Sequence, residues 1–481
     1  ALVRAGREFG RLAPECHLVS NGSWSVLACD NGLTASRMGD CQITLAKLGQ
    51  YYAPAGISLF FQGREGIFGL TPAPLYQKGE YSWEFHSAGA AWTFTWEGLA
   101  TRTTLAVPRR ENGELRRVEL SWTGEGRLEG ELLAYLEPVL CPLADFQSHP
   151  AFSRLFLEGE LDDHGVLFQR RPRGEEKSLS LAVLCEGQGI TACLDRASAL
   201  GRGGLRALGG RRAGPLERGV GTDPCLMVRF PVLLEPGERA VFALALGAGD
   251  TLAAASTGAR NILRGQAGEA ASLAPLARKL SLTERQGIEA FQLLSRLSAA
   301  EEPGERPPKS ALWPYGISGD FPLAVGPVTE GEGREQAVLW CRWHQLLTRS
   351  GYPFDLVLLV EEGGDYRRPL RTALTEELKT LGAESALGAK GGIHLADSGA
   401  APAALAWARV ILPMGPGEQR EEKLSPATPV RLSLAQPELI SIWRLLVSST
   451  ASQQKNFLPI FSSIRMPCWS NLCRISLFVD T

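Results

Sequence analysis

The sequence predicts a multidomain protein in which a large antiparallel β-sandwich is followed by a helical linker and a small α/β domain with a mainly parallel sheet. Three observations predict this fold class. Alternating apolar and polar residues, separated by glycine-containing turns, fill the chain to about residue 250. Spacing typical of helices then takes over to about residue 300. Beyond residue 320 the pattern becomes strand-then-helix, three times in succession.

Composition restricts the class of protein. The 481 residues are 44% hydrophobic and 21% charged, as in soluble globular proteins, and the formal net charge is −2. Because no basic stripe is present, we expect no nucleic-acid partner. No apolar run reaches the roughly 18 residues that a spanning helix requires, so we expect no membrane segment in this chain.

Ten cysteines are scattered along the chain, and none belongs to a CxxC pair. Most lie in apolar, strand-like contexts, which favours buried free thiols and a reducing, cytoplasmic location. Zinc sites need close pairs of Cys or His, so no metal site is expected.

Residues 1–250 are predicted to form the β-sandwich. Alternation is clearest over Ala91–Val107 and recurs over Leu179–Leu184 and Ala240–Leu246. Turn-forming runs such as Glu111–Glu114 and Glu235–Glu238 separate these segments, because Gly after Asn or Pro supplies positive φ. So many short strands over this length indicate a large sandwich rather than a small barrel.

Residues 251–311 are predicted to be a helical linker. Thr283 followed by Gln286 is a capping-box pattern, and apolar residues recur after it at nearly helical spacing. The polar, proline-rich run Glu301–Ser310 ends this region.

Residues 312–417 are predicted to form the small α/β domain. The apolar run Leu356–Val360 suits a central parallel strand that is covered on both faces. The predicted strands are Pro322–Val328, Phe354–Glu361 and Gly392–Ala396, and the predicted helices are Arg334–Arg349, Tyr366–Leu381 and Ala401–Ile411.

Residues 418–481 form an atypical tail. All 53 glycines of the chain lie at or before Gly417, and the composition changes abruptly there. We expect this tail to be out of frame or disordered; the alternative is a divergent native tail.

Five segments carry recognisable motifs in a fixed order: His17–Val26, Glu114–Leu120, Ala134–Leu140, His149–Phe156 and the junction Leu312–Leu323. Together they resemble glycoside hydrolase family 94, and most closely its cyclic β-1,2-glucan synthases and 1,2-β-oligoglucan phosphorylases. The resemblance covers about residues 15–412.

The resemblance implies a galactose mutarotase-like supersandwich. In the family this part accompanies a catalytic α/α barrel, which this chain does not match. We therefore expect the non-catalytic portion of an enzyme that is inactive alone and depends on a barrel in cis or in trans. Phosphate is the co-substrate of the intact phosphorylases, and no other cofactor is implied. A β-glucan oligosaccharide and a homo-oligomer are the other partners that the resemblance suggests. The alternative is a stand-alone glucan-binding or structural module.

The resemblance provides no catalytic residue, so candidate sugar contacts come from the residues themselves. Asp145 and His149 flank a Phe-rich loop and could hydrogen-bond a sugar or the neighbouring domain, but a polar pair that stabilises the fold is the favoured interpretation. Asp320 follows Ser318 and Gly319 in the junction; an Asp in such a turn more often bonds to the backbone than to a ligand.

Other chemistry-bearing residues have simpler interpretations. Glu361 and Glu362 precede Gly363 and are expected in a solvated turn, and His344 is expected in the core. Three tryptophans on strand segments are assigned to the core in preference to a sugar-stacking surface: Trp83, Trp92 and Trp96.

Overall fold

The computed structural model describes residues 3–413, except 48–51, 65, 163–164, 173, 175–177, 188, 202, 208–222, 301–305, 330–331 and 363–367. These residues belong to the first of two units into which the chain divides, Ala1–Glu418 and Gln419–Thr481. The predicted atypical tail lies outside the described residues, and the predicted domain boundaries stay predictions.

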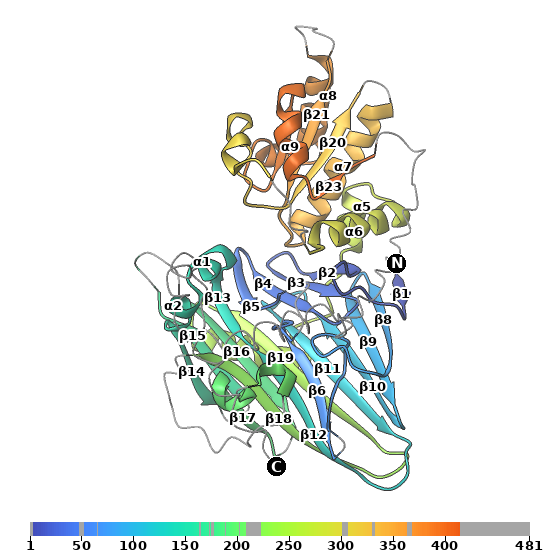
Figure 1. The fold of residues 1–481 in the computed structure, drawn as a ribbon, viewed down its shortest axis with the longest axis vertical. Coiled ribbons are helices and arrows are strands. Elements are labelled where there is room, and N and C mark those ends of the chain that lie inside the picture. Colours follow the sequence, from blue (N-terminus) through green and yellow to red (C-terminus); the bar gives the residue numbers. More distant parts are fainter. Residues whose placement is uncertain are drawn as a thin grey trace, which may run out of the picture. The chain divides into compact units, whose positions relative to one another are not determined.

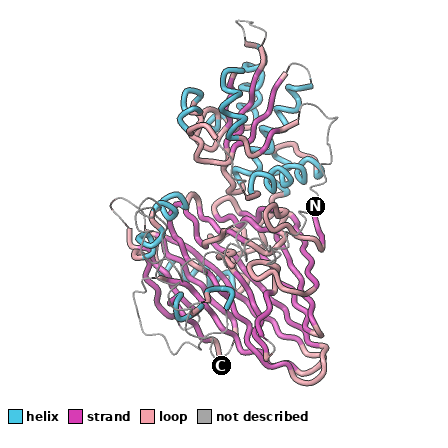
Figure 2. Tube along the Cα trace, viewed as in Figure 1, coloured by secondary structure: helices cyan, strands magenta, loops and turns pink. Residues whose placement is uncertain are grey.

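Antiparallel sheets dominate the N-terminal region, as Figures 1 and 2 show. A nine-stranded sheet contains, in spatial order, β1 (Arg4–Gly6), β8 (Glu80–His86), β9 (Gly89–Trp96), β10 (Leu99–Ala106), β11 (Gly113–Trp122), β19 (Arg239–Gly249), β16 (Leu179–Glu186), β15 (Gly165–Arg170) and β14 (Leu157–Asp162). A five-stranded sheet contains β17 (Thr191–Asp195), β18 (Pro224–Leu234), β12 (Leu128–Leu136), β6 (Ser58–Gly63) and β7 (Gly66–Gly69). Another contains β13 (Pro138–Pro142), β5 (Cys41–Thr44), β4 (Thr34–Met38), β3 (Trp24–Cys29) and β2 (Cys16–Ser20).

The sandwich core forms where the apolar faces of these sheets meet. Side chains from β9, β11 and β16 share one buried cluster with side chains from β6, β12 and β18. Trp92 and Phe94 of β9 and Phe230 of β18 belong to it, each contributing roughly 1.5–3 kcal/mol by leaving water. The predicted large antiparallel sandwich is confirmed, as is the assignment of the tryptophans: Trp83 and Trp92 are buried, and the partly buried Trp96 packs against the cluster.

The alternating run Ala91–Val107 corresponds to two strands, β9 and β10. Glu97 and Gly98 connect them, and both have positive φ, 44° and 89°. Trp96 pairs with Leu99 across this two-residue loop. Positive φ at both central residues gives a tight hairpin whose twist matches that of its strands.

Helices cover parts of the sandwich. Three are short: α1 (Leu143–Ser148), α2 (Pro150–Arg154) and α3 (Arg196–Leu200), with a 3₁₀ turn at Gly204–Ala207. The longer α4 (Leu252–Leu263) places Ala255 and Ala259 against Ala182 and Leu184 of the nine-stranded sheet. Gly247 permits this close approach, because a Cβ there would lie 2.5 Å from the Ala259 nitrogen.

Helices α5 (Ala274–Lys279) and α6 (Glu284–Ser298) follow, and α6 starts with the predicted capping box of Thr283 and Gln286. The Ser295 hydroxyl on α6 accepts a 2.8 Å hydrogen bond from the Cys16 amide of β2. Side chains of β2, α6 and the α/β region share one buried cluster. This cluster therefore ties α6 to both regions.

The α/β region contains a four-stranded, fully parallel sheet. Its spatial order is β22 (Ile393–Ala396), β21 (Asp355–Val360), β20 (Leu323–Val328) and β23 (Val410–Ile411). Its helices are α7 (Glu332–Arg349), α8 (Pro369–Thr380) and α9 (Ala401–Trp407), with 3₁₀ turns at Lys309–Ala311, Trp313–Tyr315, Glu384–Ala386 and Ser398–Ala400. The predicted parallel sheet is confirmed.

The prediction that the last helix continues to Ile411 is wrong. Helix α9 stops at Trp407, and Ala408 adopts an extended conformation. Arg409 and Leu412 then donate backbone hydrogen bonds of 2.8 Å to Leu323 and Val325 of β20. The segment expected to complete a helix up to Ile411 is thus the fourth strand.

The expectation of a solvated Glu361–Glu362 turn is also wrong for Glu362. Its Oε1 accepts hydrogen bonds from the backbone amides of Leu370 (2.7 Å) and Arg371 (2.9 Å) at the start of α8. The first amides of a helix have no intrahelical partner, so this carboxylate caps α8.

His344 lies in the core, as predicted. Its Nε2 is within 3.0 Å of the Phe354 carbonyl and 3.2 Å of the Gly391 carbonyl. Burial lowers its pKa to about 4, so the ring is neutral at physiological pH.

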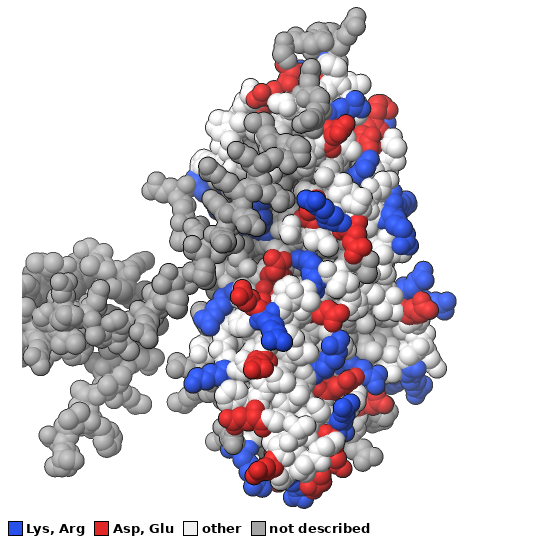
Figure 3. Space-filling model, turned by 90° about the vertical axis from the view of Figure 1, so that its right-hand side faces the viewer, with Lys and Arg blue, Asp and Glu red and all other residues white. Residues whose placement is uncertain are grey.

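Among the described residues, no helix is both long and apolar enough to cross a membrane. On the face drawn in Figure 3, acidic and basic side chains are interspersed.

Candidate functional site

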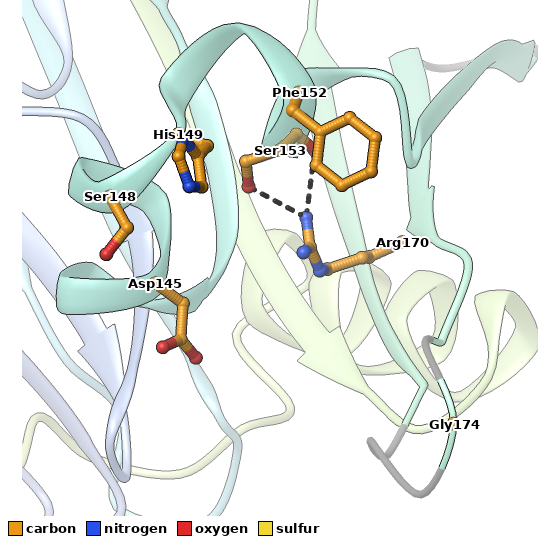
Figure 4. Close-up of a pocket in the computed structure, with 7 residues that line it drawn as sticks. All are labelled: Asp145, Ser148, His149, Phe152, Ser153, Arg170 and Gly174. Carbon is orange, nitrogen blue, oxygen red and sulfur yellow. Dashed lines mark hydrogen bonds between the residues drawn. The ribbon is translucent and has the colours of Figure 1, made fainter.

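A hollow of about 590 Å³ lies on the sandwich where α1 and α2 meet strand β15. Its volume is within the range of small-ligand sites, roughly 300–1,000 Å³. It is lined by Asp145, Ser148, His149, Phe152, Ser153, Arg170 and Gly174 (Figure 4). The structure therefore brings together two of the three predicted sugar contacts, Asp145 and His149.

The floor of the hollow is formed by two buried side chains, Arg170 and Ser153. Arg170 is the last residue of β15 and only 4% exposed, because Val166, Phe168 and Arg170 alternate on the buried side of this strand. Its Nη1 donates to the Ser153 carbonyl (3.0 Å) and lies 3.2 Å from the Ser153 hydroxyl (Figure 4). These bonds hold a positively charged group at a defined place in the hollow.

The rim is made of exposed side chains from the two short helices. Asp145 and Ser148 belong to α1, Phe152 belongs to α2, and His149 is the residue between the helices. In Figure 4 the Asp145 carboxylate and the His149 imidazole lie on one side of the hollow, with Arg170 and the Phe152 ring on the other. The hollow thus offers an acceptor, several donors and an aromatic ring.

An ion-pair network fixes α2 to the sandwich. Arg154 donates to Glu137 Oε2 at 2.6 Å and to Asp223 Oδ1 at 2.8 Å. Tyr135 donates to the other Glu137 oxygen at 2.8 Å. Burial, and to a lesser extent the Glu137 charge, raises the pKa of Tyr135, so the phenol stays protonated and keeps donating.

Asp320, the third predicted contact, does not line this hollow. It lies on the junction Leu312–Leu323, where it pairs with Lys390 (2.7 Å) and Lys309 (3.4 Å). The hydrogen bond from Lys390 is the main reason why the pKa of Asp320 is lowered. The junction is anchored by the buried Leu312 and Ile317, which pack with residues of β20 and β21.

The groups that line the hollow can bind a polar ligand. Among the described residues that line it, Asp145 is the single carboxylate, so no pair of carboxyl groups is present for general acid and base roles. In the described part of the chain, no group of three or more His, Cys, Asp or Glu side chains is placed to hold a metal ion.

Two motifs behind the family resemblance meet in a structural network away from the hollow. Glu114 Oε1 accepts two hydrogen bonds from Arg116, at 2.9 and 2.8 Å. Its Oε2 accepts from the Trp24 indole at 3.1 Å and from the Ser36 hydroxyl at 2.7 Å. Asn21 joins the same hairpin to the loop before β11 by donating to the carbonyls of Pro108 and Glu111. These motifs stabilise the fold and contribute nothing to the hollow.

Comparison with known proteins identifies the family of this chain. Residues 3–263, more than half of the chain, match the model of the supersandwich domain of glycosyl hydrolase 94. The class is therefore that of carbohydrate-active supersandwich proteins. The chain belongs to glycosyl hydrolase family 94, which confirms the predicted resemblance.

A curated relative is the cyclic beta-(1,2)-glucan synthase NdvB of Rhizobium meliloti (strain 1021), which is 24% identical over 408 residues. The alignment covers 76% of this chain but only 14% of that relative's length. Among solved structures, a bacterial glucoamylase complexed with acarbose shares 10% identity at a TM-score of 0.38, covering 62% of this chain and 44% of that one. A putative kojibiose phosphorylase from human microbiome shares 6% identity at a TM-score of 0.34, covering 61% and 37%.

Sequence reasoning missed Arg170, Ser153 and Phe152 as parts of the hollow. A signal for Arg170 existed: it continues the alternation of Val166 and Phe168, so a charged residue occupies an inward position of a strand. Ser153 and Phe152 had no such signal, because their proximity to Arg170 depends on the packing of α2 against β15.

Proposed function

We propose that this chain is the non-catalytic sandwich and α/β portion of a β-glucan phosphorylase or cyclic β-1,2-glucan synthase, and that it does not turn over substrate alone. The observation that carries the proposal is the match to the family's supersandwich domain over residues 3–263. The alignment with a cyclic glucan synthase, of which the chain spans 14%, supports the same assignment.

The geometry of the hollow agrees with this proposal. Inverting phosphorolysis needs an acid that protonates the glycosidic oxygen while phosphate attacks the anomeric carbon. In the family resemblance this acid belongs to the catalytic α/α barrel, so we assign no catalytic residue to this chain. A barrel in cis or in trans would supply the acid and the phosphate site, and no other cofactor is proposed.

We further propose a reducing, cytoplasmic environment and assembly into a homo-oligomer. All eight cysteines in the described residues are free, and the sulfurs of Cys16 and Cys29 lie 3.5 Å apart without a bond. A disulfide would place these sulfurs about 2.05 Å apart. Light scattering of the purified chain measures the oligomeric state.

A turnover assay tests the central part of the proposal. The purified chain is incubated with β-1,2-gluco-oligosaccharides and phosphate, and glucose 1-phosphate is measured; the reverse reaction is followed by phosphate release. We expect rates equal to the protein-free blank. Turnover that copurifies with the chain would refute the proposal. The alternative is a stand-alone glucan-binding or structural module.

A further inference from the structure

We propose that the hollow between α1, α2 and β15 is a binding subsite for a glucosyl residue of a neutral β-glucan chain. The identity of the sugar rests on the proposed function, whereas the site rests on the geometry of the hollow. Four features carry the inference: a fixed cation, an exposed aromatic ring, a carboxylate facing that cation, and a rigid support.

The fixed cation is Arg170. A guanidinium that is 4% exposed and bonded to Ser153 has lost its freedom before any ligand arrives. Ordering side chains during binding costs roughly 0.5–1.5 kcal/mol for each flexible one, and this cost is absent here. Arg170 and the nearby His149 and Ser148 supply donors for hydroxyl oxygens.

The aromatic ring is that of Phe152, which is 46% exposed although it lies beside a hollow. Phe156 supports it edge-on, with ring centroids 5.2 Å apart and an interplanar angle of 82°. One face of a glucopyranose ring carries only C–H groups. Covering an exposed aromatic ring with such a face removes apolar surface from water on both partners.

The carboxylate is Asp145. Two oxygens on one carboxylate accept hydrogen bonds from two adjacent hydroxyls, and hydrogen bonds to a charged acceptor are the stronger kind. Facing Arg170 across the hollow, Asp145 also opposes the binding of an anion, because like charges repel at short range. A neutral polyol can accept a hydrogen bond from Arg170 and donate one to Asp145, whereas phosphate would be repelled by Asp145.

The support is α2 and its connection to α1. His149 ends α1 and precedes the first residue of α2, so the two helices are joined without a flexible loop. Arg154 anchors α2 to Glu137 and Asp223. The rim residues are thereby held at fixed positions relative to Arg170.

Linkage selectivity follows from the requirement for adjacent hydroxyls. An internal residue of a β-1,2-glucan keeps the adjacent hydroxyls at C3 and C4, and one of a β-1,4-glucan keeps those at C2 and C3. An internal residue of a β-1,3-glucan has no two free hydroxyls on adjacent ring carbons. Only the residues at the chain ends have such a pair. We therefore expect β-1,2-linked and β-1,4-linked chains to bind more tightly than β-1,3-linked chains of equal length.

The test is isothermal titration of the full chain with cyclic β-1,2-glucan, which has no ends, in comparison with a linear β-1,3-glucan of similar length. Binding of the β-1,2-glucan at millimolar concentration or below is expected. We expect Asp145→Asn to weaken it by roughly ten-fold or more, and Phe152→Ala by roughly three- to ten-fold.

Matched controls exclude nonspecific effects. Leu155→Ala removes an apolar side chain that is 42% exposed and close to Phe152 but does not line the hollow. Asp250→Asn removes an exposed carboxylate elsewhere on the sandwich. Both controls should bind the β-1,2-glucan like the unmodified chain, and thermal unfolding checks that all four variants remain folded.

Four outcomes would overturn the subsite: no binding at millimolar sugar, equal binding of the β-1,3-glucan, no effect of Asp145→Asn and Phe152→Ala, or competition by millimolar inorganic phosphate. None of these bears on the proposed function, which fails only if the chain turns over substrate. The two proposals are therefore refuted by different readouts.

Discussion

Replacing Glu114 with glutamine should destabilise the sandwich more than almost any other change that leaves the side-chain shape unaltered. Glu114 is 0% exposed and Arg116 is 2% exposed, and the two are joined by two hydrogen bonds. Glutamine removes the negative charge and leaves the Arg116 charge buried without it. Removing one partner of a buried ion pair costs about 3–5 kcal/mol, which is a large part of the roughly 5–15 kcal/mol by which domains are stable.

The assay is urea unfolding followed by far-UV circular dichroism, because Trp24 contacts Glu114 and its fluorescence would change for local reasons. The control is Glu129→Gln, which breaks an exposed pair with Arg64. That control should change the free energy of unfolding by less than about 1 kcal/mol.

A double variant separates the loss of charge from the loss of packing. Glu114→Gln combined with Arg116→Met removes both charges but keeps an amide oxygen that can accept from Trp24 and Ser36. We expect it to recover much of the stability that Glu114→Gln loses, because no buried charge is left without a partner. A cost below about 1 kcal/mol for Glu114→Gln would refute the argument that this pair is a buried support.

Four further predictions concern single groups. Glu362→Ala should lower the free energy of unfolding by about 0.5–2 kcal/mol by uncapping α8, whereas Glu361→Ala in the same turn should not; urea unfolding distinguishes them. Asp320→Ala removes exposed pairs with lysines and should cost about 0–1 kcal/mol without weakening glucan binding; loss of binding at unchanged stability would place Asp320 in a ligand site. Burial raises the pKa of Asp30 to about 7 in the folded chain, so the folded state holds a proton that the unfolded state loses above pH 4. The contribution of Asp30 to the free energy of unfolding should therefore fall as pH rises from about 4 to 7, and Asp30→Asn should gain on the unmodified chain by up to about 1.4 kcal/mol per pH unit; parallel stability curves would contradict this. Burial lowers the pKa of His17 to about 3, so the unfolded state takes up a proton below about pH 6.5 that the folded state refuses. The contribution of His17 to the free energy of unfolding is therefore lost as pH falls from about 6.5 toward 3. His17→Gln should make the free energy of unfolding less dependent on pH over that range.

Local patterns predicted much of the fold because they act over a few residues. The capping box at Thr283 is formed within one helical turn, and α8 (Pro369–Thr380) lies within the predicted helix Tyr366–Leu381. Alternation identified the sandwich strands because one face of each sheet is buried. Each of these features is decided by neighbours along the chain, so the sequence displays it directly.

Features decided by distant contacts were harder to predict. The two residues of β23, Val410 and Ile411, are strand formers by propensity, but so short a run directly after a helix does not identify a strand until β20 offers backbone partners. Glu362 resembles a turn residue until the amides at the start of α8 are placed beside it. The same limit applies to the hollow: Asp145 and His149 are close in sequence, but Arg170 joins them only through the sheet.

The turnover assay of the purified chain tests the account most directly. With β-1,2-gluco-oligosaccharides and phosphate, we predict no glucose 1-phosphate above the blank, because no catalytic acid is assigned to the described residues. Far-UV circular dichroism of the same preparation shows that the chain is folded. Formation of glucose 1-phosphate in proportion to the amount of chain, lost after heat unfolding, would contradict the account.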